Sequence, residues 1–493
     1  MGILSLLLLL PALGALVVGL MPRRHVVWVR GTALSIAGLA GILAWSLLWR
    51  FESGLPDLQF FERTEWNPRL GTAYALGLDG LSYPMVLLTT LLTFVALLAS
   101  GGIRERAPGY YALILWLEAA LLGVFLAQDW SLFYTFWELT LIPLFFLIDR
   151  WGGARRQIAA LNFVLYTMGG SVFMLISLLV LFDAVPGHSF SMPDLTSGGR
   201  SLPLTTQILI FLGLLVGFGV KMPIFPLHSW LPLAHVEAPS PVSILLSGVL
   251  LKMGAYGLLR AAAMLPGAVL ALQDVLAGLA LFSLLYGGLL AWRQTDLKAM
   301  IAYSSIGHMG VVLLGIAALD PAGLTGAVTQ MTAHGLVAGA LFLLVGLLYE
   351  RTHTRDIYDY SSLIRTAPRF ALFITLAFMA AVGMPGTAGF VAEFHVIVGG
   401  FTRWGWLMVA VSLGVLVSAA YAIRTVGQLC TGPVRREMRD IVDLQRGEFV
   451  AATLLVVSLF VIGLVPAPLL ALSAASVQHL AGLFPQFPQG IPP

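Results

Sequence analysis

The sequence predicts an all-α polytopic membrane protein with about fourteen transmembrane helices, and three observations lead to this fold class. Hydrophobic residues make up 59% of the 493-residue chain and charged residues only 10%, which leaves too little polar surface to cover a soluble globule of this length. Apolar runs of about 20 residues, the length that crosses a bilayer, follow one another along the chain. Arginine is concentrated in alternate loops between these runs.

The predicted spans are bounded by charged or Pro/Gly-rich breaks. The first carries no positive charge before its apolar run and an Arg-Arg pair after it, which is the reverse of a cleavable secretory signal, so we expect it to remain as the first helix. The spans are expected at residues 3–21, 27–49, 78–100, 110–128, 130–149, 158–183, 204–222, 241–264, 271–291, 299–319, 322–349, 370–400, 405–429 and 449–475. The polar and aromatic segment 51–76 is expected to be an outer loop lying in the membrane interface, and 435–448 an amphipathic connector.

Counting fourteen spans divides the positive charges unevenly between the two sides of the membrane. One side receives nineteen, at Arg23, Arg24, Arg30, Arg104, Arg106, Arg150, Arg155, Arg156, Arg293, Lys298, Arg351, Arg355, Arg365, Arg369, Arg424, Arg435, Arg436, Arg439 and Arg446. The other side receives six, at Arg50, Arg63, Arg69, Arg200, Arg260 and Arg403. Because cytoplasmic loops carry an excess of Lys and Arg, we expect the first side to be cytoplasmic and both termini to lie outside.

Lysine is rare, and its placement is informative. The chain has 24 arginines but three lysines, and Lys221 and Lys252 lie inside apolar runs. Arginine keeps its proton in any environment that a protein offers, whereas a desolvated lysine can release and rebind a proton. A GC-rich genome would explain the Arg-only loops but not lysines in the spans. The sequence therefore favours a titrating role for these two residues.

Five ionisable residues lie within predicted spans, where a charge costs roughly 2.5 to 3.5 kcal/mol on insertion scales and is by default a functional candidate. They are Glu118, Glu138, Lys221, Lys252 and Glu393. Lys221 is followed by Pro223 and Pro226, which should interrupt the helix, and Glu393 follows a second interruption at residues 383–386.

Interruptions in corresponding halves of a membrane protein are typical of inverted repeats around an ion pathway. We therefore expect N-terminal helices at 1–100, a first five-helix repeat at 101–264, a second, inverted repeat at 265–430, and a connector with the last helix at 431–493. Helices seven and twelve are expected to be broken.

Histidines extend the same pattern. His228, His308, His334 and His395 fall in or beside the spans, and an imidazole can relay a proton because one nitrogen accepts while the other donates. The alternative for each is a neutral hydrogen-bond partner between helices. The other histidines that we considered, His25, His188, His235 and His353, fall in loops or at helix ends and are expected to be structural or solvated.

Several classes of function are disfavoured. The single cysteine, Cys430, excludes an internal disulfide and any cysteine-based metal or iron–sulfur site in this chain. No GxGxxG, P-loop or HExxH pattern occurs, so we expect no nucleotide, cofactor or metal site here. No basic cluster indicates nucleic acid, and the net charge of +3 suits contact with membrane lipids.

Three long segments carry a family resemblance: KMPIFPLHSWLPLAHVEAPSPVSILLSGVLLKMGAYGLLR (221–260), DLKAMIAYSSIGHMG (296–310) and MPGTAGFVAEF (384–394). They resemble the antiporter-like membrane subunits of respiratory complex I and their Mrp antiporter relatives, and the likeness runs from about residue 70 to 430. Within that family the chain is most similar to the M type (subunit M, or subunit 4), because Glu393 stands where the other types typically carry lysine.

The resemblance implies roles for the residues already singled out. Glu138 would pair with Lys221, Lys252 would be the central lysine, and Glu393 the terminal carboxylate. His228, His308 and His334 would line a hydrated axis between them. Glu118 is a further candidate for proton transfer, and Lys298 is expected to be only the inner-face start of a helix. A proton would pass from Lys221, when its pair with Glu138 opens, to Lys252 and on to Glu393 for release outside.

The resemblance also implies the biochemical setting. The chain would be a non-redox, proton-translocating subunit of an NADH:quinone oxidoreductase, driven by quinone reduction in partner subunits. The complex would contain FMN and iron–sulfur clusters and use NADH and quinone, with none of these cofactors in this chain. Partners would be L-type and N-type antiporter-like neighbours and peripheral-arm redox subunits, in a bacterial plasma membrane or a thylakoid membrane.

Three alternatives remain: an Mrp-type cation/proton antiporter subunit, a membrane subunit of a ferredoxin-linked or hydrogenase complex, and a structural spacer.

Overall fold

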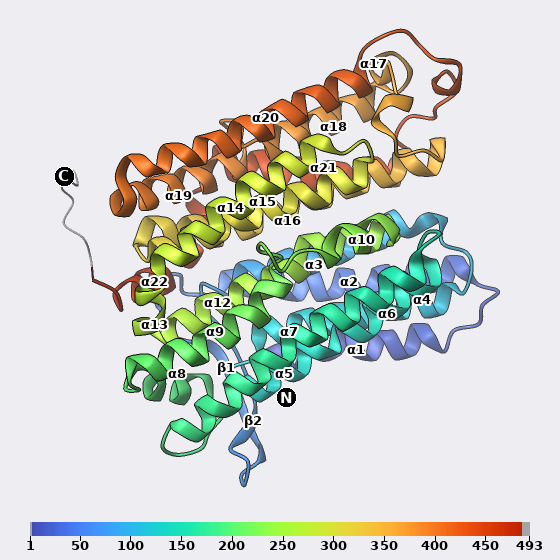
Figure 1. Cartoon of the computed structure of the whole chain (residues 1–493). Coiled ribbons are helices and arrows are strands. Elements are labelled where there is room, and N and C mark those ends of the chain that lie inside the picture. Colours follow the sequence, from blue (N-terminus) through green and yellow to red (C-terminus); the bar gives the residue numbers. More distant parts are fainter. Residues whose placement is uncertain (1, 486–493) are drawn as a thin grey trace.

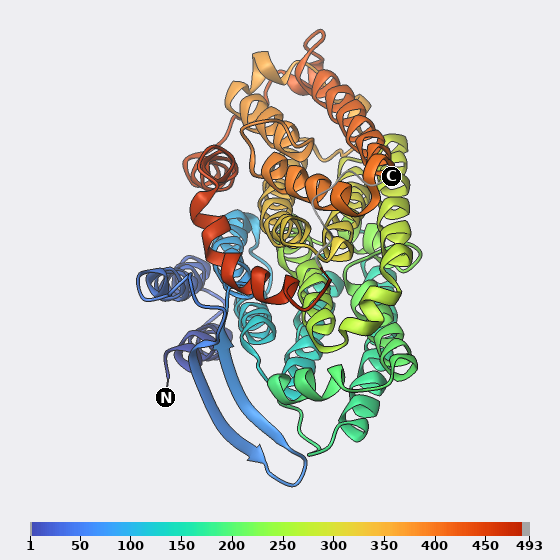
Figure 2. The same ribbon diagram turned by 90° about the vertical axis from the view of Figure 1, so that its left-hand side faces the viewer.

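The computed structural model describes residues 2–485 and is almost entirely helical. Long helices lie side by side in one bundle (Figure 1), and a view turned by 90° shows most of them end-on (Figure 2). The β-hairpin and three short helices, α8, α13 and α22, gather at one end of the bundle, and the short helix α17 lies at the other. The all-α membrane fold predicted from the sequence is confirmed.

In chain order, the long helices of the bundle and their broken partners are α1 (Ile3–Gly19), α2 (Val26–Ser46), α3 (Tyr83–Ala99), α4 (Ala107–Leu126), α5 (Trp130–Leu139), α6 (Leu141–Trp151), α7 (Arg156–Ala184), α9 (Leu204–Lys221), α10 (Trp230–Glu237), α11 (Ser240–Leu245), α12 (Leu251–Met264), α14 (Gln273–Arg293), α15 (Leu297–Ala318), α16 (Pro321–Thr352), α18 (Pro368–Ala381), α19 (Ala388–Trp404), α20 (Val409–Cys430) and α21 (Arg446–Leu464). The short outlying helices are α8 (Met192–Arg200), α13 (Pro266–Ala271), α17 (Leu363–Thr366) and α22 (Ala467–Ala481).

The number of membrane crossings agrees with the prediction. Within residues 2–485, 12 helical stretches are long and apolar enough to cross a membrane. One of them, Ala388–Cys430, contains two helices, and α1 and α18 are shorter apolar helices. With α18 and α19 counted as the two parts of one broken helix, the described chain has fourteen crossings.

Both predicted interruptions are present. The first separates α9, which ends at Lys221, from α10, and the intervening turn contains Pro223 and Pro226, which lack a backbone N–H to donate. The second separates α18 from α19. Here Gly383 and Gly386 have φ of +72° and +93°, a backbone conformation that glycine adopts without steric strain. Each interruption leads into a helix that carries ionisable residues.

Two further irregularities were not predicted. The span Trp130–Trp151 is divided at Thr140, two residues after Glu138. The span Ser240–Met264 contains a π-helical segment, Leu246–Leu250, which ends two residues before Lys252. Single π turns inside α-helices are often found at functional sites, and both irregularities lie beside candidate residues.

Two expectations about the outer segments were wrong. The expected outer loop 51–76 forms an antiparallel hairpin of β1 (Gln59–Asn67) and β2 (Thr72–Leu78). The expected last span, 449–475, ends at Leu464, and after Pro466 the chain begins a separate helix, α22, which Figure 2 shows lying across the end of the bundle. The helix stops there because Pro466 has no backbone N–H to continue it. Between α20 and α21, the predicted amphipathic connector has only a 3₁₀ turn at Arg436–Met438.

The longest helix, α16, is the centre of the bundle. It has 32 residues, and its apolar core is completely buried by contacts with α15, α19, α11, α3, α21 and α22. Because lipid cannot reach its middle, polar side chains there meet only other protein groups.

Candidate functional site

Lys252 lies at the start of the candidate site, on α12 directly after the π-helical segment. Its side chain is completely buried. The ammonium donates a hydrogen bond to the carbonyl of Ser247, at 2.6 Å, and its Nζ lies 2.8 Å from Nδ1 of His334 on α16. A second contact joins Ser247 Oγ to Ser305 Oγ on α15, at 3.1 Å. Lys252 therefore has the partners that a buried ammonium requires.

His334 continues the contacts toward a second histidine. The rings of His334 and His308 lie with centroids 5.1 Å apart and planes tilted by 34°. Nδ1 of His308, on α15, lies 3.3 Å from Nε2 of Gln330 and 3.8 Å from Oε1 of Glu393 on α19. Lys252, His334, His308 and Glu393 thus form a row of contacts across four helices, which we call the Lys252–Glu393 row.

A small cavity of about 10 Å³ lies at the Glu393 end of this row. His308, Glu393, Ser304, Ser418 and Tyr421 line it together with apolar residues. A cavity needs roughly 10–15 Å³ of this kind of space, and two to four polar partners, to hold one water molecule. The site therefore suits a water that bridges the imidazole of His308 and the carboxyl group of Glu393.

Lys221 has a different environment at the end of α9. Its Nζ is buried without a hydrogen-bond partner among the described residues, and it lies over aromatic rings, 5.1 Å from the Trp137 centroid and 5.8 Å from the Phe163 centroid. Such cation–π contacts partly replace lost hydration. Glu138 follows Trp137 in sequence, but within residues 2–485 no ion pair of 4.0 Å or less joins it to Lys221. One Glu138 oxygen, Oε1, is also buried without a partner.

Aromatic side chains fill the space around Lys221. The rings of Phe133, Trp137 and Phe218 pack on one another at centroid distances of 5.6 to 6.2 Å. Phe218 also packs on α12, where a Cβ at Gly257 would come within 2.3 Å of its ring. In the part of the chain that the structure describes, no hydrogen-bonded connection leads from Lys221 to Lys252.

Two other predicted residues lie outside the row. Glu118 is fully buried on α4, and neither carboxyl oxygen has a hydrogen-bond partner in the described residues. His228, in the first helix interruption, packs against Phe225 and Tyr286 at centroid distances of 5.7 and 5.3 Å. The structure thus brings together Lys252, His308, His334 and Glu393, and leaves Glu118, Glu138, Lys221 and His228 apart from them.

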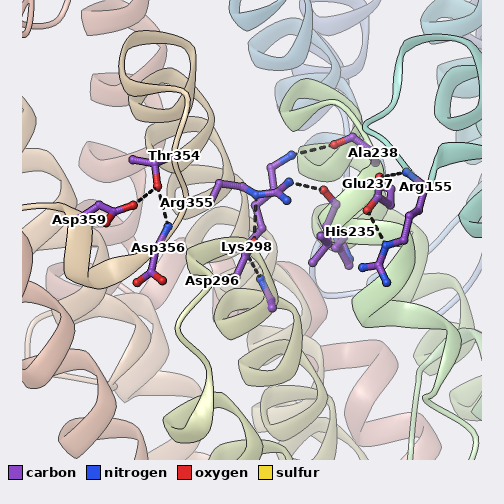
Figure 3. A network of polar contacts seen from close by, with 12 residues as sticks. Arg155, His235, Glu237, Ala238, Asp296, Lys298, Thr354, Arg355, Asp356 and Asp359 are labelled. Atoms are coloured by element: carbon purple, nitrogen blue, oxygen red, sulfur yellow. Dashed lines mark hydrogen bonds and ion pairs between the residues drawn. The ribbon is translucent and has the colours of Figure 1, made fainter. Parts of the chain in front are cut away.

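Two residues that the sequence did not single out lie close to the row (Figure 3). Lys298, expected only as a helix start, is 3% exposed and donates from Nζ to the carbonyl of Ala238 at 2.7 Å. His235, expected in a loop or at a helix end, is 0% exposed on α10 and stacks on Phe342 at 4.6 Å. The polar segment 235–238 beside a broken helix was the available signal. Residues 2–485 contain no group of three or more His, Cys, Asp or Glu side chains that could hold a metal ion.

Comparisons with known proteins agree with this architecture. Residues 127–418 match the family described as NADH:quinone oxidoreductase/Mrp antiporter, TM. The chain is 41% identical over 475 residues to NAD(P)H-quinone oxidoreductase chain 4 2 of Thermosynechococcus vestitus, covering 94% of this chain and 89% of that one. It is 39% identical over 497 residues to NADH-quinone oxidoreductase subunit M of Rhodobacter capsulatus, covering 97% and 96%.

Solved structures give the same result. A chain of respiratory complex I from Thermus thermophilus with bound NADH superimposes with a TM-score of 0.88 at 33% identity, over 97% of this chain and 99% of that chain. A chain of the Mrp complex from Dietzia sp. superimposes with a TM-score of 0.83 at 24% identity, over 96% and 52%, which is a likeness of fold alone.

Proposed function

The chain belongs to the NADH:quinone oxidoreductase/Mrp antiporter transmembrane family, and from that premise we propose that it is the M-type proton-translocating subunit in the membrane arm of an NADH:quinone oxidoreductase. The relatives that it matches along nearly their whole length are named as chain 4 or subunit M of such complexes. The chain would carry no electrons itself. FMN, iron–sulfur clusters, NADH and quinone would be handled by partner subunits.

The observation that carries this proposal is the Lys252–Glu393 row. Each member can exist with or without the transferred proton, and each lies in contact with the next, or is separated from it by room for one water. An imidazole that accepts a proton on one nitrogen and releases one from the other moves charge without moving itself. Protons on Lys252 can therefore reach Glu393 through His334 and His308, and Glu393 is the group that releases them.

Glu138 and Lys221 would control this row electrostatically. Both are partly desolvated and unpaired in the structure, and a charge that approaches or leaves a buried ammonium changes its affinity for a proton. Partner subunits that move Glu138 toward or away from Lys221 would thereby alter the field at Lys252. This arrangement transmits the energy of quinone reduction without any electron carrier in the chain.

We propose the following membrane setting. The end of the bundle that holds α17 and the arginine-rich loops faces the cytoplasm, and the end that holds the hairpin and α22 faces outward. L-type and N-type antiporter-like subunits would adjoin the bundle in the membrane arm. The membrane would be the plasma membrane, or the thylakoid membrane in a photosynthetic cell.

The test is made in the assembled complex, in inside-out membrane vesicles. Lys252→Ala and Glu138→Gln should each lower NADH-driven proton pumping by about tenfold or more, because groups that transfer protons contribute about 10²–10⁴ to rates. NADH oxidation with a soluble electron acceptor should continue, because the peripheral arm is unchanged. Near-normal pumping in both variants would refute the proposal.

The antiporter alternative predicts a different result in the same vesicles. A family that includes Mrp antiporters and a fold shared with an Mrp complex keep this function open. Sodium-dependent proton flux in membranes without NADH or quinone activity would favour it. Proton flux that requires NADH and quinone, at all sodium concentrations, would exclude it.

A further inference from the structure

His235 is a buried imidazole without the partners that such a group normally has. Neither Nδ1 nor Nε2 has a hydrogen-bond partner among the described residues, although the side chain is completely buried. Leaving a buried polar atom unpaired typically costs about 1–3 kcal/mol, so most are paired with protein or with ordered water. The stacked ring of Phe342 holds the imidazole plane but satisfies neither nitrogen. An imidazole in this state is suited to exchange protons with water or with a neighbouring base.

The neighbours of His235 connect it to the row already described. Both Lys298 and Lys252 are close enough to act on its charge, and His235 in turn acts on the charge of His334. Three residues further along the chain, the carbonyl of Ala238 accepts the hydrogen bond from Lys298. His235 therefore lies between Lys298 on one side and the Lys252–His334 contact on the other.

A larger cavity reaches this place from the arginine-rich face. It has a volume of about 240 Å³, enough for several water molecules. Its polar wall contains Glu237, Lys298, Glu350 and Arg355, and backbone of residues 236–241 forms part of its lining. We call it the Glu237 cavity.

The groups that fix the inner wall of the Glu237 cavity are visible in Figure 3. Arg355 donates to the carbonyl of Val236 at 2.7 Å and pairs with Asp296 at 3.0 Å. From the other side, the backbone N–H of Arg155 donates to Glu237 at 2.8 Å. The peptide that follows His235 is thus held between two anchored arginines, and Glu237 is kept at the cavity wall.

We propose that His235 is the proton uptake residue of this chain, which carries protons from the Glu237 cavity to the middle of the row at Lys252 and His334. This inference rests on the proposed function and adds to it the route by which protons reach the row. In each transfer one ring nitrogen of the neutral imidazole takes a proton from water in the cavity, and the other nitrogen gives one proton to Lys252 or His334. The histidine ends neutral, so protons and charge balance.

The proposal changes the role of Lys221. Protons that join the row at Lys252 do not pass through the aromatic cluster of Phe133, Trp137 and Phe218, which contains no polar bridge in the described residues. Lys221 then acts on the row through its charge. The route that the sequence predicted, from Lys221 to Lys252, is replaced by a route that starts at His235.

The first test replaces His235 in the assembled complex. His235→Gln keeps a polar side chain of similar size but cannot take up a proton, and it should lower NADH-driven pumping in inside-out vesicles by about tenfold. His25→Gln is the matched control, because His25 is exposed at the start of α2 on the same arginine-rich side and its side chain makes no capping bond. It should pump as wild type. Normal pumping by His235→Gln, with assembly confirmed on native gels, would overturn the proposal.

A second test does not depend on replacing a buried residue. Ile103 lines the Glu237 cavity, and Val442, which is 59% exposed, lies outside it on the same face. A cationic methanethiosulfonate reagent added to inside-out vesicles should slow pumping by Ile103→Cys about threefold or more beyond its effect on wild type, because it places a fixed charge where protons enter. Val442→Cys should be unaffected. Equal responses of the two variants would count against the cavity as the uptake route.

Glu393→Gln in the same vesicles separates the two proposals. If it abolishes pumping while His235→Gln pumps normally, the uptake route is wrong and the row stands. If both variants pump normally, the proposed function itself fails.

Discussion

Lys252 and Lys221 are both buried, yet their neighbours give them different chemistry. Lys252 touches a carbonyl and an imidazole, so a proton that leaves it has an acceptor within 2.8 Å. Lys221 faces rings of Trp137 and Phe163, which attract its charge but cannot accept its proton. The same side chain therefore serves transfer in one place and electrostatic control in the other.

His334 is the residue on which the row depends most, because it alone contacts both Lys252 and His308. His334→Gln should keep a hydrogen bond to Lys252 through the amide oxygen, but it cannot pass a proton on. We expect NADH-driven pumping to fall by about tenfold or more while the complex still assembles. The measurement is pumping relative to NADH oxidation with a soluble acceptor.

His395→Gln is the control for that variant. His395 lies on α19, two residues after Glu393, but its Nδ1 contacts only the carbonyl of Val391 in its own helix, at 2.7 Å. It should therefore pump within about twofold of wild type, as expected for a surface change of small effect. Equal losses in both variants would mean that any change near Glu393 disturbs the bundle, and that His334 has no special place in transfer.

Sequence reasoning found four members of the row because charge inside an apolar run is conspicuous. It missed His235 for a physical reason: residues 230–237 follow a helix break and look like a loop, but in the fold α10 packs against α7 and α15 and becomes interior. Lys298 was underrated for the same reason, since its partner, the carbonyl of Ala238, lies 60 residues away in the chain. The contact between Glu138 and Lys221, implied by resemblance, stays a prediction.

At the scale of single elements, the hairpin has a role that its position in sequence conceals. Glu62 on β1 lies beside the start of α1, where its carboxylate accepts from the backbone N–H of Leu4 at 2.7 Å and from the hydroxyl of Ser5 at 2.5 Å. The first N–H groups of a helix have no partner within the helix. The hairpin therefore caps a helix whose own N-cap residue, Gly2, makes no side-chain bond.

Glu62→Ala should loosen the first turn of α1. Loss of a cap typically costs about 0.5–2 kcal/mol, and loss of a negative charge at a helix N-terminus adds to it. We expect hydrogen exchange at the amides of Leu4 and Ser5 to accelerate by about tenfold, measured by mass spectrometry on the assembled complex. Glu65→Ala, on the exposed side of the same strand, should leave these amides unchanged. Faster exchange in both variants would indicate a general loss of the hairpin.

The elements that the sequence could predict are those whose signal is local. Runs of apolar residues predict the long helices, and Pro223, Pro226 and Gly383 mark the two breaks because each restricts or frees its own backbone. The hairpin was missed because its pairing, such as Arg63 with Ala75, is settled between segments. The separate helix α22 was missed because apolar residues continue past Pro466. The π turn before Lys252 has no local marker at all.

At the scale of the whole molecule, the arrangement places uptake, transfer and release in different parts of one rigid bundle. The Glu237 cavity lies on the arginine-rich side, the row crosses α12, α16, α15 and α19, and Glu393 lies beside the second break. The central helix α16 carries His334 and packs against both α11 and α19. A small shift of this helix would alter contacts at both ends of the row, which gives neighbouring subunits a way to control transfer.

The topology of the molecule yields a prediction that depends on the number of crossings alone. Gly54 precedes α3 and Gly447 lies at the start of α21, and an odd number of membrane crossings separates them. A Cβ at either glycine would meet nothing within 4 Å, so cysteine fits at both places, and the native Cys430 is buried. An impermeant thiol reagent should therefore label Gly447→Cys in inside-out vesicles and Gly54→Cys in spheroplasts, with each variant protected in the other preparation. This outcome follows because the loop that contains Gly447 is rich in arginine and stays in the cytoplasm. Labelling of both cysteines from one side would require an even number of crossings, and the count of fourteen would be wrong.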